Sequence, residues 1–462
     1  MTKKTLKIML VVLVVGLLVA CGGGYDAGIE PQNLYPSNPY PTEPEEPYEP
    51  EELYEPEEIE EPEEIANFAT DALHLVEIIE QTHPIFVADG WLAEDYGLIR
   101  DEFLLYAQNP YLTGLDFAFA IHRYLTTLRD GHMSGAVLVP VAGGFNLAVY
   151  GGTFNIDWIA IDGNLYYDGQ LVETIGGVSV SEVLATVDRY FYPENETDRQ
   201  FNYARFSRLQ DIIERAGGEI INNTLEITLQ DEYDTTTITV HRGQPGGSQG
   251  FDFIIRYEIL DDIFFIDLRS FQLGEHITDT AYAITQAIDD GIRKFIVDLR
   301  SNGGGDSRAG QELLEAMGIV VPSFGGLRRI SPLAIDQREV PEDWLNSEYA
   351  SFEPNIWPNN NPNNVFVSIL TDAQTFSSAN MMAAWVQDGG FGNIVGSPSR
   401  QAPSAFGDML SYTLPYSGFF IHISYTQFLR PNPLADQTTL WPDIMVDPEY
   451  ALDAAIEYLG GL

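Results

Sequence analysis

The 462-residue sequence contains a single cysteine, Cys21. An internal disulfide and a zinc site built from several thiolates are therefore excluded. Lysine is almost as scarce, because Lys3, Lys4 and Lys7 lie at the N-terminus and only Lys294 follows them. The chain has 23 basic and 69 acidic residues, for a formal net charge of −46. Such a charge argues against nucleic acid as a partner. No two histidines have ligand spacing near a carboxylate, so we expect no metal site.

Long hydrophobic runs are also missing. The apolar run from Ile8 to Ala20 has 13 residues, which is too short to span a bilayer comfortably. It follows a lysine-rich start and ends in Leu18-Val19-Ala20-Cys21, which is typical of a secretory signal. The ending resembles a bacterial lipobox. The resemblance implies that residues 1–20 are a lipoprotein signal peptide and that Cys21 is lipidated. The protein would then be exported and anchored to the outer face of the bacterial cell membrane. A plain secretory signal with an incidental cysteine is the alternative.

Residues 21–64 are acidic and low in complexity. Between Pro31 and Glu64 the chain consists largely of Pro, Glu and Tyr. Such a segment cannot bury enough apolar surface to fold, and its charges repel one another. We expect a disordered stalk that holds the folded part away from the membrane. A tyrosine-rich adhesive or ion-binding tract is the alternative.

Three patterns divide the rest of the chain. Residues 65–136 show helical spacing of apolar residues, with a break at His83-Pro84. Residues 137–245 contain short β-rich runs. Residues 251–462 alternate strands and helices, which predicts an α/β layer architecture. Within this last region, residues 320–364 lack periodicity and are expected to form a surface loop or lid.

Two segments of the α/β region carry candidate chemistry. The first, Asp298-Leu299-Arg300-Ser301-Asn302-Gly303-Gly304-Gly305, follows a buried strand and lacks the Gly-Lys-Ser/Thr of a P-loop. The second, Thr371 to Asn380, places Ser377 at the entrance of an expected helix. There Ser377 could simply cap the helix. Alternatively, it could be a nucleophile beside the free amide of Ser378 and the positive helix end.

With Gly396-Ser397-Pro398, Phe406-Gly407-Asp408 and Trp441-Pro442-Asp443, these segments resemble the tail-specific (C-terminal processing) serine peptidases over roughly residues 70–460. The resemblance implies a crotonase/ClpP-like α/β core at 251–462, with Ser377 as nucleophile. It also implies an oxyanion hole made by the amides of Gly304 and Ser378. Residues 169–180 resemble the turn of a PDZ-like module, a module that binds peptide termini by strand addition. Asn380 departs from the family pattern, which has Glu at this position.

The serine needs a base, and the family's usual lysine is missing because Ala402 stands at the matching position. His132 is the candidate, because Arg129-Asp130-Gly131-His132 resembles the histidine segment of the tricorn-like branch. A histidine with a pKa near 6.5 can accept a proton at neutral pH. A turn histidine bonded to backbone is the alternative. His83 is interpreted as structural.

An acid should orient His132. Asp436 is the first candidate, and Asp130 and Asp388 compete with it. Ser248, within Gly246-Gly247-Ser248-Gln249-Gly250, fits the Gly-x-Ser-x-Gly pattern but is not followed by a helix, so we interpret it as a connector.

The sequence thus predicts a serine endopeptidase that hydrolyses peptide bonds of proteins or peptides without a cofactor. A non-catalytic peptide-binding lipoprotein on the same fold is the main alternative, and a solute receptor is a weaker one.

Overall fold

The computed structural model describes residues 67–133, 137–141, 144–147, 152–231, 234–243, 252–358 and 360–461. The expected signal peptide, Cys21 and the stalk lie outside the described residues, and so does the Gly246–Gly250 segment. No helix in the described ranges is both long enough and apolar enough to cross a membrane.

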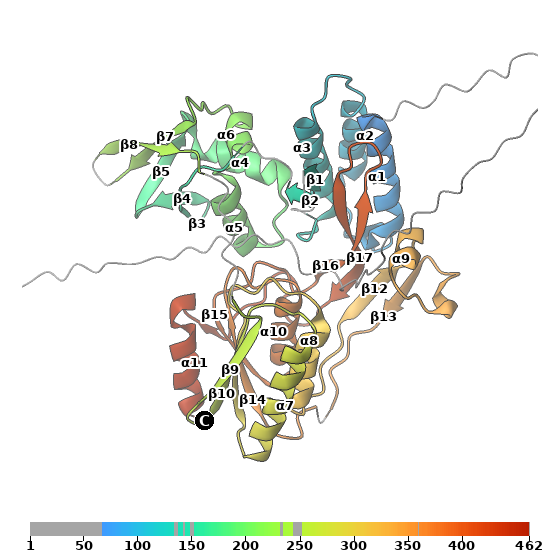
Figure 1. Cartoon of the computed structure of the whole chain (residues 1–462), viewed down its shortest axis with the longest axis vertical. Coiled ribbons are helices and arrows are strands. Elements are labelled where there is room, and N and C mark those ends of the chain that lie inside the picture. Colours follow the sequence, from blue (N-terminus) through green and yellow to red (C-terminus); the bar gives the residue numbers. More distant parts are fainter. Residues whose placement is uncertain are drawn as a thin grey trace, which may run out of the picture.

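The C-terminal half forms an α/β layer around a six-stranded sheet with the order β18-β15-β14-β11-β10-β9 (Figure 1). All neighbouring strands run parallel except β9, which pairs antiparallel with β10. The strands are β9 (Ile255–Leu260), β10 (Ile263–Leu268), β11 (Lys294–Asp298), β14 (Phe366–Thr371), β15 (Gly392–Gly396) and β18 (Ile444–Met445).

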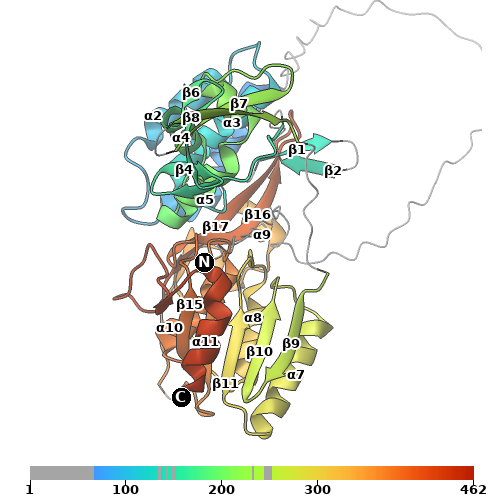
Figure 2. The ribbon, with the colours of Figure 1, turned by 90° about the vertical axis from the view of Figure 1, so that its left-hand side faces the viewer.

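Helices cover both faces of this sheet (Figure 2). On β10, Phe264 and Ile266 pack with the helices of one face, while Ile263 and Phe265 pack with α11 on the other. This alternation follows from the two-residue period of a strand and explains why Ile263 to Ile266 are all apolar. Asp267, near the end of β10, is instead ion-paired with Arg256 and Arg269. The first face carries α7 (Glu275–Asp289), α8 (Ser307–Ala316) and α10 (Ser378–Gly389), and the second carries α11 (Ala451–Gly460).

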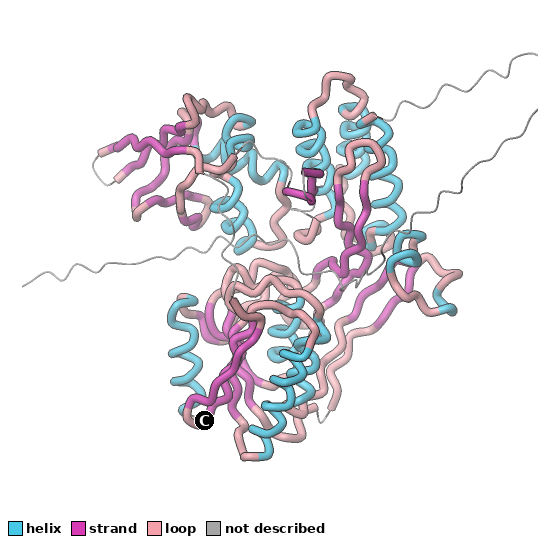
Figure 3. Tube along the Cα trace, in the orientation of Figure 1, coloured by secondary structure: helices cyan, strands magenta, loops and turns pink. Residues whose placement is uncertain are grey.

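The N-terminal helices pack against a long hairpin from the C-terminal half. The hairpin strands are β16 (Ala405–Thr413) and β17 (Phe420–Leu429), and Figure 3 shows them running from the α/β layer to the helices. Phe406 and Ile421 of the hairpin share a buried apolar cluster with Leu75, Phe117 and other helical residues. The helices are α1 (Phe68–Thr82), α2 (Tyr96–Tyr106) and α3 (Gly114–Leu125), with short 3-10 turns η1 (Pro84–Phe86) and η2 (Thr126–Leu128).

A β-rich unit has its own sheet, β3-β4-β5-β7-β8 with β6 beside β5, and its own apolar cluster. Its strands are β3 (Ile159–Ile161), β4 (Asn164–Tyr167), β5 (Gln170–Ile175), β6 (Val178–Ser179), β7 (Thr224–Gln230) and β8 (Thr235–His241). Its helices are α4 (Val180–Tyr190), α5 (Glu196–Phe206) and α6 (Gln210–Arg215). We call this the β-rich unit; its likeness to a PDZ module stays a prediction.

Two expectations about organisation differ from the structure. Strands β1 (Val137–Val141) and β2 (Gly144–Leu147) were expected within the PDZ-like region, but β1 pairs with β17 of the hairpin. The stretch 320–364 is not a loop without regular structure. It contains β12 (Gly325–Arg329), α9 (Pro332–Gln337), η3 (Glu342–Trp344) and β13 (Tyr349–Phe352). Strand β12 pairs with β17, so a tertiary partner stabilises a segment that has no amphipathic period of its own.

Candidate active site

Ser377 lies in the tight turn between β14 and α10. Its backbone has φ 54° and ψ −126°, a region that a non-glycine residue rarely occupies. The conformation is held from both sides, because the Ser377 amide donates to the side-chain oxygen of Gln401 and its carbonyl accepts from the amide of Met381 at 3.0 Å. A strained backbone that is held in this way is typical of functional sites.

His132 lies next to this serine. It belongs to the turn that follows α3 and η2, and its Nε2 is 3.1 Å from the Ser377 Oγ. Only 6% of its side chain is exposed, and its ring lies 4.7 Å from the ring of Phe376. Burial lowers the pKa of His132, although the Asp130 carboxylate and the Phe406 backbone act in the opposite direction and the charge of Arg400 adds to the lowering. A lowered pKa keeps the imidazole neutral at neutral pH, as a general base requires.

Asp130 is the carboxylate that accompanies His132. It is 1% exposed, and its Oδ1 accepts from the His132 amide at 2.8 Å and lies 3.7 Å from His132 Nδ1. The Nδ1 atom itself makes no well-aligned hydrogen bond. Burial alone would raise the pKa of Asp130, but the hydrogen bond from His83 and the electrostatic interactions with both histidines lower it overall. Asp130 is therefore an ionised acceptor on the side of the ring opposite to the serine.

His83 supports Asp130 from behind. The His83 Nδ1 accepts from the Ile85 amide at 3.2 Å, so its proton lies on Nε2, which is 3.1 Å from Asp130 Oδ2. His83 was interpreted as structural. Its position makes it a structural residue of the site itself, because it orients the candidate acid.

The other two acids that were considered have partners elsewhere. Asp436 is exposed and accepts from the Thr438 amide at 2.9 Å and from the Trp441 indole at 2.9 Å. These hydrogen bonds, from the Thr438 amide above all, lower the pKa of Asp436 to about 2. Asp388 forms a buried ion pair with Arg430 at 2.8 Å. The structure thus brings Asp130 to His132, and it shows no contact between His132 and either Asp436 or Asp388.

The glycine turn after β11 meets the serine turn after β14, since these strands are parallel neighbours and end at the same edge of the sheet. The Phe376 amide donates to the Asn302 carbonyl at 3.0 Å, and the Ser301 amide donates to Asp372 at 3.0 Å. Gly304 has φ 97°, and a Cβ built there would lie 2.6 Å from the Ser377 Cβ. Glycine is required at this position, because any side chain would displace Ser377.

The two expected oxyanion donors differ in their present bonding. Among the described residues the Ser378 amide has no acceptor, and its hydroxyl donates to the Gly305 carbonyl at 2.5 Å. The Gly304 amide donates to the Asn302 side chain at 2.8 Å. Ser378 is therefore an open donor beside Ser377, while the Gly304 amide must leave or share its bond with Asn302 to bind an oxyanion.

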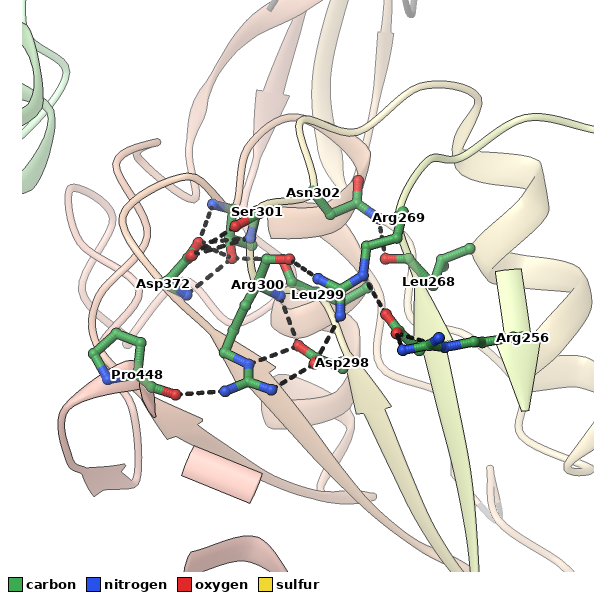
Figure 4. Close-up of polar contacts among 12 residues, drawn as sticks. Arg256, Leu268, Arg269, Asp298, Leu299, Arg300, Ser301, Asn302, Asp372 and Pro448 are labelled. Carbon is green, nitrogen blue, oxygen red and sulfur yellow. Dashed lines mark hydrogen bonds and ion pairs between the residues drawn. The ribbon is translucent and has the colours of Figure 1, made fainter. Parts of the chain in front are cut away.

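Charged side chains hold the glycine turn (Figure 4). Asp298 is ion-paired with Arg269 at 2.9 Å and with Arg300 at 2.6 Å. Burial would raise the pKa of Asp298, but the hydrogen bond from Arg300 and the two nearby arginine charges lower it overall. Asn302 adds a bond from its side-chain amide to the Leu268 carbonyl at 2.7 Å. The turn is thus preorganised from several strands.

Asp130, His132 and Glu194 form the one group, within the described ranges, that could bring three ligand atoms within 4.8 Å of one another. Both Glu194 oxygens accept backbone amides, and Asp130 accepts from the His132 amide and contacts His83. A metal ion would have to replace these bonds. We therefore interpret the group as part of a Ser–His site.

Comparison with known proteins gives a family match for part of the chain. Residues 262–444 match the model of peptidase family S41. The match covers less than half of the chain, and we refer to residues 262–444 as the S41 domain. The domain includes Ser377 and Gly304, whereas His132 and Asp130 lie outside the matched residues. No curated protein sequence matches the chain.

Solved structures extend the likeness to most of the chain. Mature CPAF complexed with lactacystin aligns with a TM-score of 0.57 at 13% identity, covering 86% of this chain and 97% of that one. Mature CPAF aligns with a TM-score of 0.56 at 12% identity, covering 85% and 95%. At such identities the likeness concerns the mixed α/β fold, with its N-terminal helices and β-rich segment around the S41 domain.

Sequence reasoning missed how two residues, Gln401 and Asn380, support the candidate nucleophile Ser377. Gln401 accepts from the Ser377 amide, and Asn380 accepts from the Ser399 hydroxyl at 2.6 Å and so holds the segment that carries Gln401. Asn380 was noted only as a departure from the family pattern. Nothing in the local sequence marks Gln401, because its role depends on the approach of a segment 24 residues away.

Proposed function

We propose that this chain is a serine endopeptidase that hydrolyses peptide bonds through an acyl-enzyme. The observation that carries the proposal is the 3.1 Å approach of His132 Nε2 to the Ser377 Oγ in an S41 domain. The Ser377 oxygen attacks the scissile carbonyl carbon, while His132 Nε2 takes the hydroxyl proton and returns it to the leaving amine. Water then hydrolyses the acyl-enzyme by the same proton route.

Asp130 is proposed as the acid in place of Asp436. For Nε2 to accept a proton, Nδ1 must carry the ring's hydrogen, and Asp130 Oδ1 is the carboxylate oxygen that faces Nδ1 at 3.7 Å. The negative charge of Asp130 also stabilises the imidazolium that forms during attack.

The oxyanion is proposed to bind the Ser378 amide and the Gly304 amide. The start of α10 adds the positive end of a twelve-residue helix to the Ser378 donor. The Gly304 amide becomes available when the substrate oxygen replaces Asn302 as its acceptor.

The exported, lipid-anchored location is also part of the proposal. It rests on the lysine-rich start, the short apolar run and Cys21. Protein or peptide substrates would then be met outside the cell membrane.

The test is covalent labelling of residues 65–462 with a fluorophosphonate, which reacts with activated serines. We expect labelling of the wild type and none in Ser377→Ala. In His132→Ala we expect a rate at least ~100-fold lower, because the base is lost. A folded wild type without labelling would refute the peptidase proposal and favour a non-catalytic peptide-binding protein. Labelling that persists in His132→Ala would refute His132 as the base.

A further inference from the structure

Glu194 reaches the active site from the β-rich unit. It lies in the short connection between α4 and α5, and its two carboxyl oxygens have different acceptor roles. Oε1 accepts from the Gly131 amide at 2.8 Å, and Oε2 accepts from the Ala402 amide at 2.9 Å.

Each of these amides belongs to a residue that is adjacent in sequence to a residue of the candidate active site. Gly131 immediately precedes His132, the candidate base. Ala402 immediately follows Gln401, whose side chain accepts from the Ser377 amide. One carboxyl group therefore spans the segment that carries the base and the segment that holds the nucleophile.

The glycine of the Asp-Gly-His turn provides the room for this contact. Gly131 has no positive φ, so its backbone does not require glycine. A Cβ built there would lie 2.6 Å from Glu194 Oε1 and 2.9 Å from its carboxyl carbon. Any other residue would push Glu194 away from the base.

The electrostatic setting of Glu194 is unfavourable. Burial raises its pKa well above the ordinary glutamate value, and the nearby Asp130 and Asp198 raise it further. The nearby Arg400 is ion-paired with Asp198 at 3.3 Å. Holding a carboxyl group in such surroundings is costly, so the packing of the β-rich unit must impose it.

Other contacts dock the same connection on the S41 domain without touching the base. The Asn195 side-chain amide donates to the Ser399 carbonyl at 3.2 Å and to the Thr438 carbonyl at 3.3 Å. These bonds hold the β-rich unit in place. The bond to Ser399 reaches the segment of Gln401, but neither bond contacts Gly131, Ala402 or the segment of the base. Asn195 thus provides a matched control for Glu194.

We propose that Glu194 is a positioning residue that couples the β-rich unit to the Ser377–His132 pair. The inference rests on the proposed peptidase function. When the β-rich unit is docked, Glu194 holds both catalytic segments at once. When the unit shifts, both segments lose the same support, so the placement of this unit sets the reactivity of the serine.

The test measures fluorophosphonate labelling of residues 65–462 over a range of probe concentrations, which separates the maximal rate from the binding constant. We expect Glu194→Ala to lower the maximal rate by about 10- to 100-fold with little change in probe binding, since two bonds to the catalytic segments are lost. Glu194→Gln should restore part of the rate, because its single carbonyl oxygen can accept one of the two amides.

Two control variants separate positioning from loosening of the interface. Asn195→Ser keeps the cap of α5 but removes the bonds to Ser399 and Thr438, and it should label at close to the wild-type rate. Glu173→Gln changes an exposed carboxylate of the same unit and should have no effect. Melting curves verify that each variant is folded.

The outcomes are distinguishable. An unlabelled wild type would refute the peptidase proposal. A labelled wild type with an unchanged maximal rate in Glu194→Ala would refute the coupling alone. An equal loss in Asn195→Ser and Glu194→Ala would also refute it, because undocking would then explain both. If Glu194→Ala does not fold, Glu194→Gln becomes the deciding variant. A maximal labelling rate of Glu194→Gln equal to that of the wild type would overturn the proposal.

Discussion

Replacing Asp130 by asparagine is the most informative perturbation of this site. The Asp130 Oδ1 accepts from the His132 amide at 2.8 Å, and Oδ2 faces the His83 Nε2 at 3.1 Å. An asparagine has one acceptor oxygen and one NH₂ group, so in either orientation its NH₂ group faces a donor. His83 cannot adapt by moving its proton, because its Nδ1 accepts from the Ile85 amide. The substitution therefore removes the charge and disturbs the orientation of His132.

The magnitude follows from the distance between the charges. At 3.7 Å and an effective dielectric constant of about 20, a carboxylate stabilises an imidazolium by about 4 kcal/mol. That energy corresponds to roughly three decades in rate. Because the asparagine dipole retains part of the stabilisation, we expect Asp130→Asn to lower the labelling rate by about 100- to 1000-fold.

The pH dependence of the labelling rate provides a second, independent test of the role of Asp130. In the wild type, burial lowers the pKa of His132, and the Asp130 charge partly opposes this. The base is neutral above its pKa, so labelling should persist below pH 6.5 and fall as the pH drops through the lowered pKa. Without the Asp130 charge the pKa of His132 falls further, and the acidic limb should move to still lower pH.

The assay is the fluorophosphonate labelling rate between pH 4 and 9, with Asp436→Asn as the matched comparison. Asp436 is bonded to Thr438 and Trp441 in its own loop, so its variant should keep the wild-type rate and profile. Wild-type behaviour of Asp130→Asn, together with a large loss in Asp436→Asn, would refute the assignment and restore Asp436 as the acid.

Two further predictions concern the oxyanion turn and the N-terminus. Gly304→Ala should cost about 1–3 kcal/mol of stability and lower labelling at least ~100-fold, since its φ of 97° is unfavourable for alanine and its Cβ would contact Ser377. Gly291→Ala, at φ 96° with nothing within 4 Å, should lose similar stability in thermal melts but keep full labelling; equal labelling losses would contradict the steric reasoning. In a bacterial host that lipidates exported proteins, the full chain should incorporate labelled palmitate and sediment with membranes, and Cys21→Ser should do neither. A wild type without palmitate would refute the anchor.

The local pattern of the sequence was sufficient for most elements of the α/β layer. The largely apolar runs at 263–268 and 295–299 correspond to β10 and β11, because strands buried on both faces need apolar residues at most positions. Asp267 and Asp298, near the ends of these runs, are ion-paired with arginines. The positions of the candidate nucleophile and the glycine turn could be predicted for a similar reason. Each follows directly after such a strand, so a short stretch of sequence contains both the residue and its structural context.

Contacts between distant segments were much harder to predict. Asp436 was chosen by its order along the chain, while the structure places it in an exposed loop. Asp130 is next to His132 in sequence, but its role depends on His83, which lies 47 residues earlier. The stretch 320–364 was expected to be a loop because it has no periodicity of its own. Its strands form through pairing, since β12 pairs with β17 and β13 pairs with β12.

The sequence by itself indicated the likeness to S41 peptidases and the position of Ser377 and the glycine turn at one sheet edge, because a strand, a tight turn and a helix are local patterns. Only the tertiary structure decided which acid faces the base, which side chain holds the nucleophile's amide, and that a glutamate of the β-rich unit supports both segments. These choices depend on the directions of side chains brought together from separate units of the fold. Such directions follow from packing across the whole molecule and are not encoded in any one segment.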